Sequence, residues 1–323
     1  MKTPSRMLAR LALAVSALLT PVVSSAADSG KPLTIAVVGK ATTHSYWKSV
    51  EAGARKAGEE LNVKIEWQGP LDDSKVADQI AIFNNLATSG IDGMVFAPCD
   101  DKALAPHVRT AARRGLPISI IDSPLAARQG RDYINYVSTD NKAAGNTAAD
   151  TLIKLVGPQP AYGGQVLMIR FTEGSASTRQ REDGFTERLA RDGAFKIVAQ
   201  QFTDGSMAGA QRVAETLLGN YVKNNKLELD GIFAPNQPSA EGTYNAVNAL
   251  RKKGVEVKAR FVGFDDSALL LQGLDNGVID ALVVQAPFQM GYLGVKSVVA
   301  HIKGEPVEAL VDTGVTVKTK DSK

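Results

Sequence analysis

The stretch DGMVFAP at residues 92–98 returns, little changed, as DGIFAPN at residues 230–236. Each copy leads into an amphipathic helix and then into a further apolar run that ends in an aspartate, Asp122 after PISII and Asp265 after RFVGF. A strand, a helix and a second strand are the units from which layered α/β domains are built. The repeat therefore predicts two similar α/β lobes in one chain.

Apolar runs alternate with amphipathic segments along most of the chain. Between the runs, apolar residues recur at helical spacing, for example at Val50, Ala54 and Ala57. Runs this uniformly apolar are typical of parallel strands that are covered on both faces. The predicted strands are 34–39, 91–98, 117–122, 165–170, 196–202, 231–235, 260–265 and 279–285. The expected fold class is α/β, with two Rossmann-like lobes that each hold a parallel sheet.

The first 27 residues differ in character from the rest of the chain. Lys2, Arg6 and Arg10 precede an apolar run at 11–19, and small residues follow at 24–27. This pattern predicts a secretory signal peptide at 1–27 that is cleaved after Ala26 or Ala27, and its apolar run is too short to span a membrane. We therefore expect an exported protein.

The charge balance argues against a nucleic-acid partner. The full chain has 37 Lys and Arg residues against 34 Asp and Glu residues, and the predicted signal peptide contains three of the basic residues and none of the acidic ones. Cleavage leaves 34 of each, so the expected net charge is zero and no basic surface is implied. Cys99 is the only cysteine, which excludes an internal disulfide and is typical of a small packing residue.

Polar and aromatic residues gather where the predicted strands end. In open parallel sheets, ligands bind beyond the carboxyl ends of the strands. Carboxylates accept hydrogen bonds from hydroxyls, guanidinium groups donate in a fixed fork, amides do both, and aromatic rings pack against the apolar face of a sugar. The candidates at these positions are Lys40, the segment 44–47, Cys99, Asp100, Asp122, Ser123, Arg179, Asn236, Gln237, Asp265 and Gln285.

Several of these residues have a purely structural alternative. Asp100 or Asp101 is placed to cap the helix that follows it, and Asp122 and Asp265 could do the same for theirs. Trp47 is large enough to be a core residue rather than a stacking surface. The residues alone leave these alternatives open.

Catalytic and cofactor motifs are missing from the sequence. GKATTH follows the first strand, where a dinucleotide-binding chain has its glycine-rich turn, and no phosphate-loop motif occurs. Three histidines in the whole chain give no metal-ligand spacing, and no serine stands in a G-x-S-x-G turn. We therefore expect a binding protein rather than an enzyme, with no cofactor and no metal.

The order of these motifs resembles the periplasmic sugar-binding proteins of ABC importers, in the ribose-binding-protein-like group that shares its fold with the ligand domain of LacI-type repressors. The resemblance covers the chain from Leu33 to about Thr319. It rests on the aromatic pair at 46–47, an Asp at a strand end at 122, STDN at 138–141, STRQREDGF at 177–185, APN at 234–236, VGFD at 262–265 and VVQAP at 283–287. A LacI-like regulator is disfavoured, because the signal peptide stands where a helix-turn-helix would lie.

The resemblance implies roles for individual residues. Tyr46 and Trp47 would form aromatic walls, Asp122 and Asp265 would accept from hydroxyls, Arg179 would be the forked donor, and Asn236 and Gln285 would supply amides. Lys40 and the pair Pro235 and Asn236 are placed as in relatives that bind furanose-type quorum signals or deoxyhexoses. Ser123 replaces the Arg of ribose-type members.

The resemblance also implies a domain division and partners. It implies a first lobe of 28–139 with 286–312, a second lobe of 140–285 with 313–323, and a hinge of three crossings near 139, 285 and 312. The expected ligand is a neutral monosaccharide or sugar alcohol, which a monomer delivers to an ABC permease in the inner membrane. The alternative is a receptor for a furanose-type quorum signal or a deoxyhexose that serves transport, or signalling through a chemoreceptor or a sensor kinase.

Overall fold

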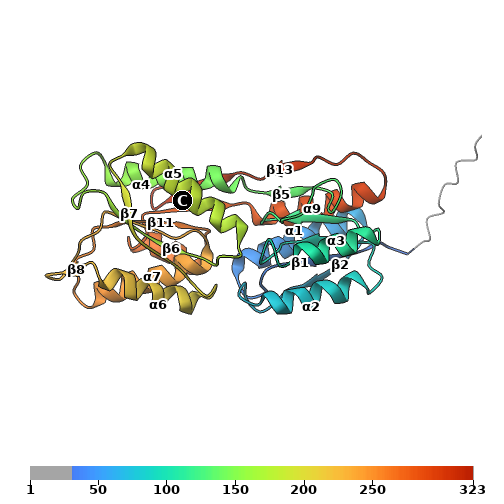
Figure 1. The fold of residues 1–323 in the computed structure, drawn as a ribbon, viewed down its shortest axis with the longest axis horizontal. Helices are drawn as coiled ribbons and strands as arrows, with labels where there is room; N and C mark the ends of the chain where they lie inside the picture. The colour runs from blue at the N-terminus through green and yellow to red at the C-terminus, as the bar shows by residue number, and fades with distance from the viewer. Residues whose placement is uncertain (1–30, 323) are drawn as a thin grey trace, which may run out of the picture. The chain divides into compact units, whose positions relative to one another are not determined.

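A computed structural model describes residues 31–322, so the predicted signal peptide lies outside the described residues. Figure 1 shows two lobes, each built on a sheet with helices on both of its faces. The predicted class, two Rossmann-like α/β lobes, is confirmed. No helix within 31–322 is long and apolar enough to cross a membrane.

The first sheet is parallel throughout. Its strands in spatial order are β13 (Leu310–Asp312), β5 (Tyr136–Ser138), β4 (Ile118–Ile121), β3 (Gly93–Phe96), β1 (Thr34–Val38) and β2 (Lys64–Gln68). One face packs on α1 (Ser45–Leu61) and α9 (Pro287–Ile302), and the other on α2 (Val76–Ala87) and α3 (Ala105–Arg113). Buried Val, Ile, Ala and Met side chains fill both interfaces.

The second sheet repeats this plan, with one antiparallel strand added at its edge. Its strands in spatial order are β14 (Val315–Thr319), β12 (Ala281–Gln285), β11 (Arg260–Phe264), β10 (Gly231–Phe233), β6 (Gln165–Arg170) and β7 (Lys196–Phe202). The helices of this lobe are α4 (Asn141–Val156), α5 (Ala176–Asp192), α6 (Met207–Gly219), α7 (Gln237–Lys252) and α8 (Ala268–Asp275), and a small hairpin joins β8 (Val222–Lys223) to β9 (Lys226–Leu227).

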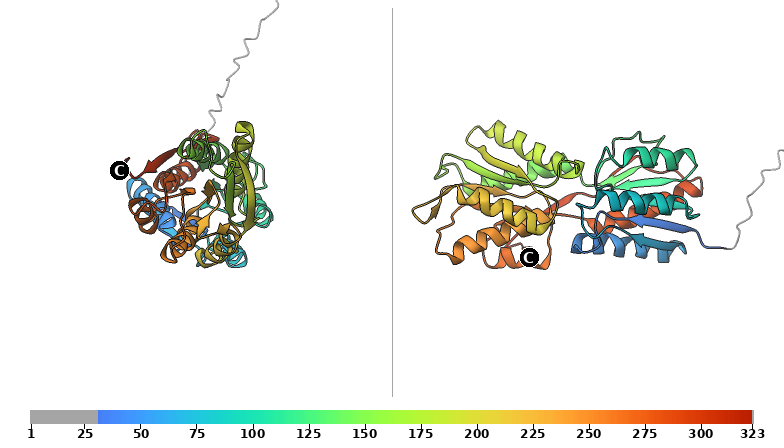
Figure 2. Two further views of the ribbon diagram at one scale, coloured as in Figure 1. Left: turned by 90° about the vertical axis from the view of Figure 1, so that its left-hand side faces the viewer. Right: turned by 60° about the horizontal axis from the view of Figure 1, so that its bottom comes forward.

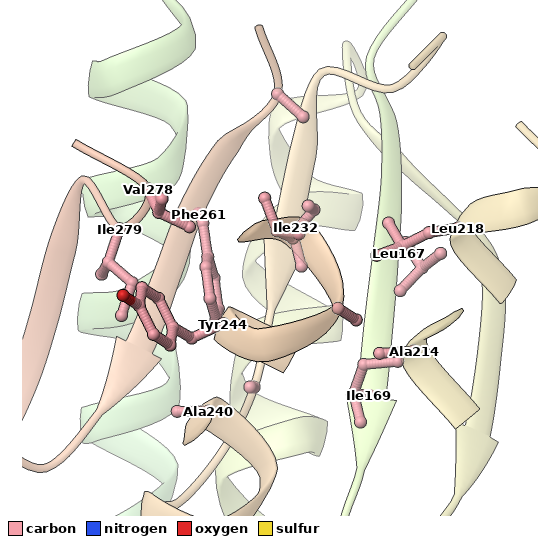
Figure 3. Close-up of a cluster of buried hydrophobic side chains, with 14 of the residues drawn as sticks. Leu167, Ile169, Ala214, Leu218, Ile232, Ala240, Tyr244, Phe261, Val278 and Ile279 are labelled. Carbon is pink, nitrogen blue, oxygen red and sulfur yellow. The ribbon is translucent and has the colours of Figure 1, made fainter. Parts of the chain in front are cut away.

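The core under α6, α7 and α8 is apolar throughout. Figure 3 shows Leu167, Ile169 and Ile232 of the sheet facing Ala214 and Leu218, with Tyr244 beside Phe261. Burial of such side chains contributes on the order of 2 kcal/mol each, which holds the sheet and its strand ends in place.

The chain passes between the sheets three times, after β5, after β12 and after β13. As a result α9 and β13, drawn in red in Figure 1, lie with the blue and green elements of the first lobe, and α1 packs along α9. Figure 2 shows the same arrangement from two further sides. Three separate connections of this kind allow one lobe to move relative to the other as a rigid body.

Glycines bring α4 and α5 into close contact. A Cβ on Gly145 of α4 would lie 2.1 Å from the backbone oxygen of Arg181, and a Cβ on Gly184 of α5 would lie 2.2 Å from that of Lys142. A side chain at either position would push the two helices apart. This close crossing fixes the position and rotation of α5, and with them the direction of Arg181.

Candidate ligand-binding site

A cavity lies between the two lobes, at the carboxyl ends of their strands. The space between its walls, including the open mouth, is about 350 Å³. The residues that line it are Lys40, His44, Tyr46, Trp47, Asp73, Asp122, Phe171, Ser175, Ser177, Thr178, Arg181, Asn236, Gln237, Pro238, Asp265 and Gln285. Polar groups from both lobes therefore face one small volume.

Asp122 and Asp265 occupy equivalent places in the two lobes. Each follows a central strand, and each adopts a left-handed backbone conformation, with φ of 62° and 67°. Their backbone N–H groups donate to Val137 and Val283 on the neighbouring strands, at 3.1 and 2.9 Å. A non-glycine residue in this conformation costs on the order of 1–3 kcal/mol, and such residues cluster at ligand-binding sites.

Asp122 contacts two buried polar groups of its own lobe, one through an ion pair and one through a hydrogen bond. Lys40 Nζ lies 2.6 Å from its Oδ2, and the Tyr46 hydroxyl donates to its Oδ1 at 2.8 Å. Burial and the Asp122 carboxylate raise the pKa of Tyr46 well above its usual value, so the phenol keeps its proton and remains a donor. Lys40, with 4% of its surface exposed, neutralises a carboxylate that water hardly reaches.

Tyr46 and Trp47 belong to both the core and the cavity. Their rings meet edge to face, with centroids 5.0 Å apart, and both side chains are buried in the first-lobe core. Both also line the cavity. Trp47 is therefore both a core residue and part of the cavity wall.

Asp265 is held by amide donors instead of an ammonium group. Gln285 Nε2 donates to its Oδ1 at 2.8 Å, and the backbone N–H of Gln237 donates to its Oδ2 at 2.9 Å. Burial raises the pKa of Asp265 to about 6, although Arg181 and both hydrogen bonds act in the opposite direction. This carboxyl group consequently titrates close to neutral pH.

Arg181 is the guanidinium group that lines the cavity. Its Nε donates to Asn141 Oδ1 at 2.8 Å, and one terminal nitrogen donates to the Pro235 carbonyl at 2.9 Å. The other terminal nitrogen donates to Gln285 Oε1, and the group lies over the Phe264 ring. The side chain is buried, so these contacts hold its orientation.

Arg179, to which the resemblance assigns the role of forked donor, is not among the residues that line the cavity. Its side chain lies outside the cavity lining and donates to Asp101 Oδ2 of the first lobe at 2.8 Å. The reason is helix geometry, because positions two residues apart on an α-helix differ by about 200° in direction. Since α5 turns Arg181 toward the cavity, Arg179 points to the rim.

The other residues to which the resemblance assigns ligand contacts do line the cavity, and two of them also have structural roles, whereas the strand-end candidates Cys99, Asp100 and Ser123 do not line it. Asn236 caps α7 by accepting from Ser239 N at 3.2 Å, and Gln285 Oε1 accepts from the Thr139 hydroxyl at 3.2 Å. Asp100 does not cap α3 as expected, because the N-cap of that helix is Leu104 and has no side-chain hydrogen bond. Its Oδ1 instead accepts from the backbone N–H groups of Lys102 and Ala103, at 2.9 and 2.7 Å, in the turn before the helix.

The lobes are joined across the cavity by hydrogen bonds. Ser177 N of α5 donates to Ser123 Oγ at 3.1 Å, and Gln237 Oε1 accepts from Ser45 Oγ at 3.1 Å and from Tyr46 N at 3.2 Å. Contacts of this kind hold the two walls at a fixed separation. The two lobes are therefore in direct contact beside the cavity.

Several residues that line the cavity are not among the ligand contacts that the resemblance implies. Arg181 stands in the STRQREDGF motif, beside the arginine that was chosen, and Ser177 and Thr178 open the same motif. Asp73 follows β2, a strand that the apolar pattern did not predict because its residues are only partly buried. Applied to β2, the strand-end rule selects the segment that contains Asp73.

Comparison with known proteins agrees with this geometry. Residues 35–306 match the family model described as a periplasmic binding protein domain. The chain belongs to the periplasmic binding protein family. This periplasmic binding protein is 27% identical over 306 residues to the ribose import binding protein of Haemophilus influenzae, with 95% of this chain and 97% of the relative covered.

Solved structures of similar proteins extend the comparison. A carbohydrate transporter solute-binding protein from Agrobacterium radiobacter in complex with D-arabinose is 34% identical, with a TM-score of 0.81 over 90% of this chain and 95% of that one. An ABC transporter solute-binding protein from Agrobacterium vitis with bound D-fucose is 33% identical, with a TM-score of 0.81 over 89% and 96%.

Proposed function

We propose that this periplasmic binding protein captures a neutral monosaccharide or sugar alcohol between its closing lobes and delivers it to an ABC-type permease. The observation that carries the proposal is the pair of strand-end carboxylates, Asp122 and Asp265, which face one cavity from opposite lobes. The sugar-binding relatives support the same ligand class.

The cavity chemistry suits a polyhydroxylated ligand. Asp122 and Asp265 would accept from hydroxyls, Arg181 and Lys40 would donate, and the amides of Asn236 and Gln285 would do both. The Trp47 ring would pack against the C–H face of the sugar. Each carboxylate has a basic side chain nearby, so a charged ligand would leave an unpaired charge in a buried site.

Closure of the lobes would couple binding to recognition by the permease. A ligand shifts an open–closed equilibrium only by its difference in affinity for the two states, so contacts from both lobes are needed. We place the lobe boundaries at the three crossings, so that 286–312 belongs to the first lobe and 140–285 to the second. The support is the membership of β13 in the first sheet and of β12 and β14 in the second.

The location and partners follow from the same proposal. The signal-like residues 1–27 and the family support export to the periplasm, where a monomer without catalytic activity would meet an inner-membrane permease. A deoxyhexose is the second candidate ligand class, because one of the similar solved structures holds D-fucose.

A thermal-shift screen of the purified chain tests the proposal. The panel is D-ribose, D-allose, D-arabinose, D-fucose, D-galactose, L-rhamnose and the matching polyols. A ligand at a hundredfold excess over its Kd stabilises the folded state by about 2.7 kcal/mol, which raises the melting temperature by several degrees. A rise with at least one sugar is expected, and no rise with any of them contradicts the proposal.

A further inference from the structure

Asp73 is a buried carboxylate that the fold itself does not use. It lies in the loop between β2 and α2, lines the cavity, and keeps only 7% of its surface exposed. Within the described residues its Oδ2 has no hydrogen-bond partner, and the ring nitrogen Nδ1 of His44, at 3.4 Å, is its ion-pair contact. A buried acceptor without a hydrogen bond costs about 1–3 kcal/mol, and more when it is charged.

The neighbouring Asp72 already does the structural work of this loop. Asp72 Oδ1 accepts from both the backbone N–H and the hydroxyl of Ser74, which closes the turn. Asp73 does not cap α2 either, since that helix begins after Lys75 without a side-chain cap. The loop conformation therefore gives no reason for a carboxylate at position 73.

Hydrogen bonds from the neighbouring segment hold the loop that carries Asp73 in place. The hydroxyls of Thr42 and Thr43 donate to the carbonyls of Pro70 and Leu71, at 3.2 and 3.1 Å, which ties the loop to the segment that carries His44. An acceptor fixed in this way is preorganised for a donor that enters the cavity.

The pKa of His44 reflects the negative potential around Asp73. Burial acts to lower the pKa of His44, but the carboxylates of Asp73 and Asp72 from the loop and of Glu241 from α7 raise it above its ordinary value. Glu241 Oε1 already accepts from Gln237 and Ser267, at 2.9 and 2.6 Å, whereas Asp73 Oδ2 has no hydrogen bond within the described residues.

We propose that Asp73 is a further ligand-binding residue, whose Oδ2 accepts a hydrogen bond from a sugar hydroxyl other than those bound by Asp122 and Asp265. This inference rests on the proposed function and deepens it. It assigns the ligand a third hydroxyl that faces a carboxylate, on the side of the cavity formed by the β2–α2 loop. Sugars that lack this hydroxyl would leave Asp73 Oδ2 without a hydrogen bond and bind more weakly.

The test compares Asp73→Asn with Asp72→Asn, which removes the same charge one residue away and outside the cavity lining. Affinities of the wild type and both variants are measured by calorimetric titration with D-ribose, D-allose, D-arabinose, D-galactose and D-fucose, the last pair differing only in the 6-hydroxyl. Melting temperatures are recorded without sugar.

For the sugar that binds the wild type most tightly, Asp73→Asn should weaken binding about 10- to 100-fold, the range expected for a hydrogen bond to a charged group, whereas Asp72→Asn should stay within about threefold. Without sugar, Asp73→Asn should melt no lower than the wild type. Equal binding by Asp73→Asn, or a loss of sugar-free stability, overturns the inference and leaves the proposed function standing. If the wild type binds none of the sugars, the proposed function is overturned and the inference with it.

Discussion

Asp122 and Asp265 share a position, a backbone conformation and a cavity, but they differ in what holds them. Asp122 is paired with the ammonium of Lys40 at 2.6 Å and with the Tyr46 hydroxyl. Asp265 is held by an amide side chain and a backbone N–H, and its pKa rises to about 6. A strand-end aspartate in the left-handed backbone conformation therefore occurs in two different electrostatic environments in the same protein. The first lobe has a fixed ion pair, and the second has a carboxyl group that protonates near neutral pH.

The largest effect is expected from Asp122→Ala. The substitution leaves the Lys40 ammonium buried without its counter-charge, and breaking one side of a buried ion pair costs about 3–5 kcal/mol. Urea unfolding measures this loss. The double variant with Lys40→Met should recover much of it, because an apolar side chain needs no counter-charge. A loss of less than about 1 kcal/mol in Asp122→Ala would show that the ion pair does not hold the first lobe together.

The second largest effect is the pH dependence that Asp265 contributes to stability. Its pKa is raised from about 3.9 in the unfolded chain to about 6 in the folded one, so the folded state binds the proton more tightly. The contribution of Asp265 to stability is therefore fully present below about pH 4 and is lost as the pH rises through 6, by up to about 3 kcal/mol. Unfolding of the wild type and of Asp265→Asn between pH 4 and 7.5 tests this. Parallel pH profiles would contradict the assignment.

Asp265→Ala should cost less stability at pH 7 than Asp122→Ala. It leaves the donors of Gln285 and Gln237 unpaired, at about 1–3 kcal/mol for each buried group. It also removes a carboxylate whose ionised form is already penalised by burial, so we expect a net loss of about 2 kcal/mol. Urea unfolding under the same conditions gives the comparison, and a loss larger than that of Asp122→Ala would reverse the proposed difference between the lobes.

The smallest effect is expected at the contact between the lobes, from Arg179→Gln. Arg179 and Asp101 are partly exposed, and pairs of this kind contribute about 0–1 kcal/mol. The affinity for the tightest sugar should fall less than about fivefold, whereas Arg181→Gln should weaken it far more. Arg212→Gln, which breaks an exposed pair within one lobe, is the matched control. Loss of binding in Arg179→Gln alone would return the ligand role to Arg179.

The fold was predictable where burial is uniform. The apolar runs that became β1, β3, β4 and β10–β12 identified both sheets, because strands covered on two faces lack polar interruptions. The edge strand β2 was not predicted, because KIEWQ mixes charged, polar and apolar residues and gives no continuous apolar run. The short strands β5 and β13 give too few residues for a pattern.

The site was predictable where residues end strands and less so where they lie on helices. Asp122, Asp265 and Gln285 follow the rule because the ends of parallel strands gather at one edge. Arg181 depends on the rotation of α5, which is set by its contact with α4 and is not encoded in local spacing. Asp73 was not predicted as a site residue, because β2, the strand that precedes it, was not predicted.

The most direct test of the account is a crystal structure of the chain with the sugar that stabilises it most. We expect one sugar in the cavity, with hydroxyls within hydrogen-bonding distance of both Asp122 and Asp265. The Trp47 ring should lie against the C–H face of the sugar. A sugar bound by one lobe only, or outside this cavity, would contradict it.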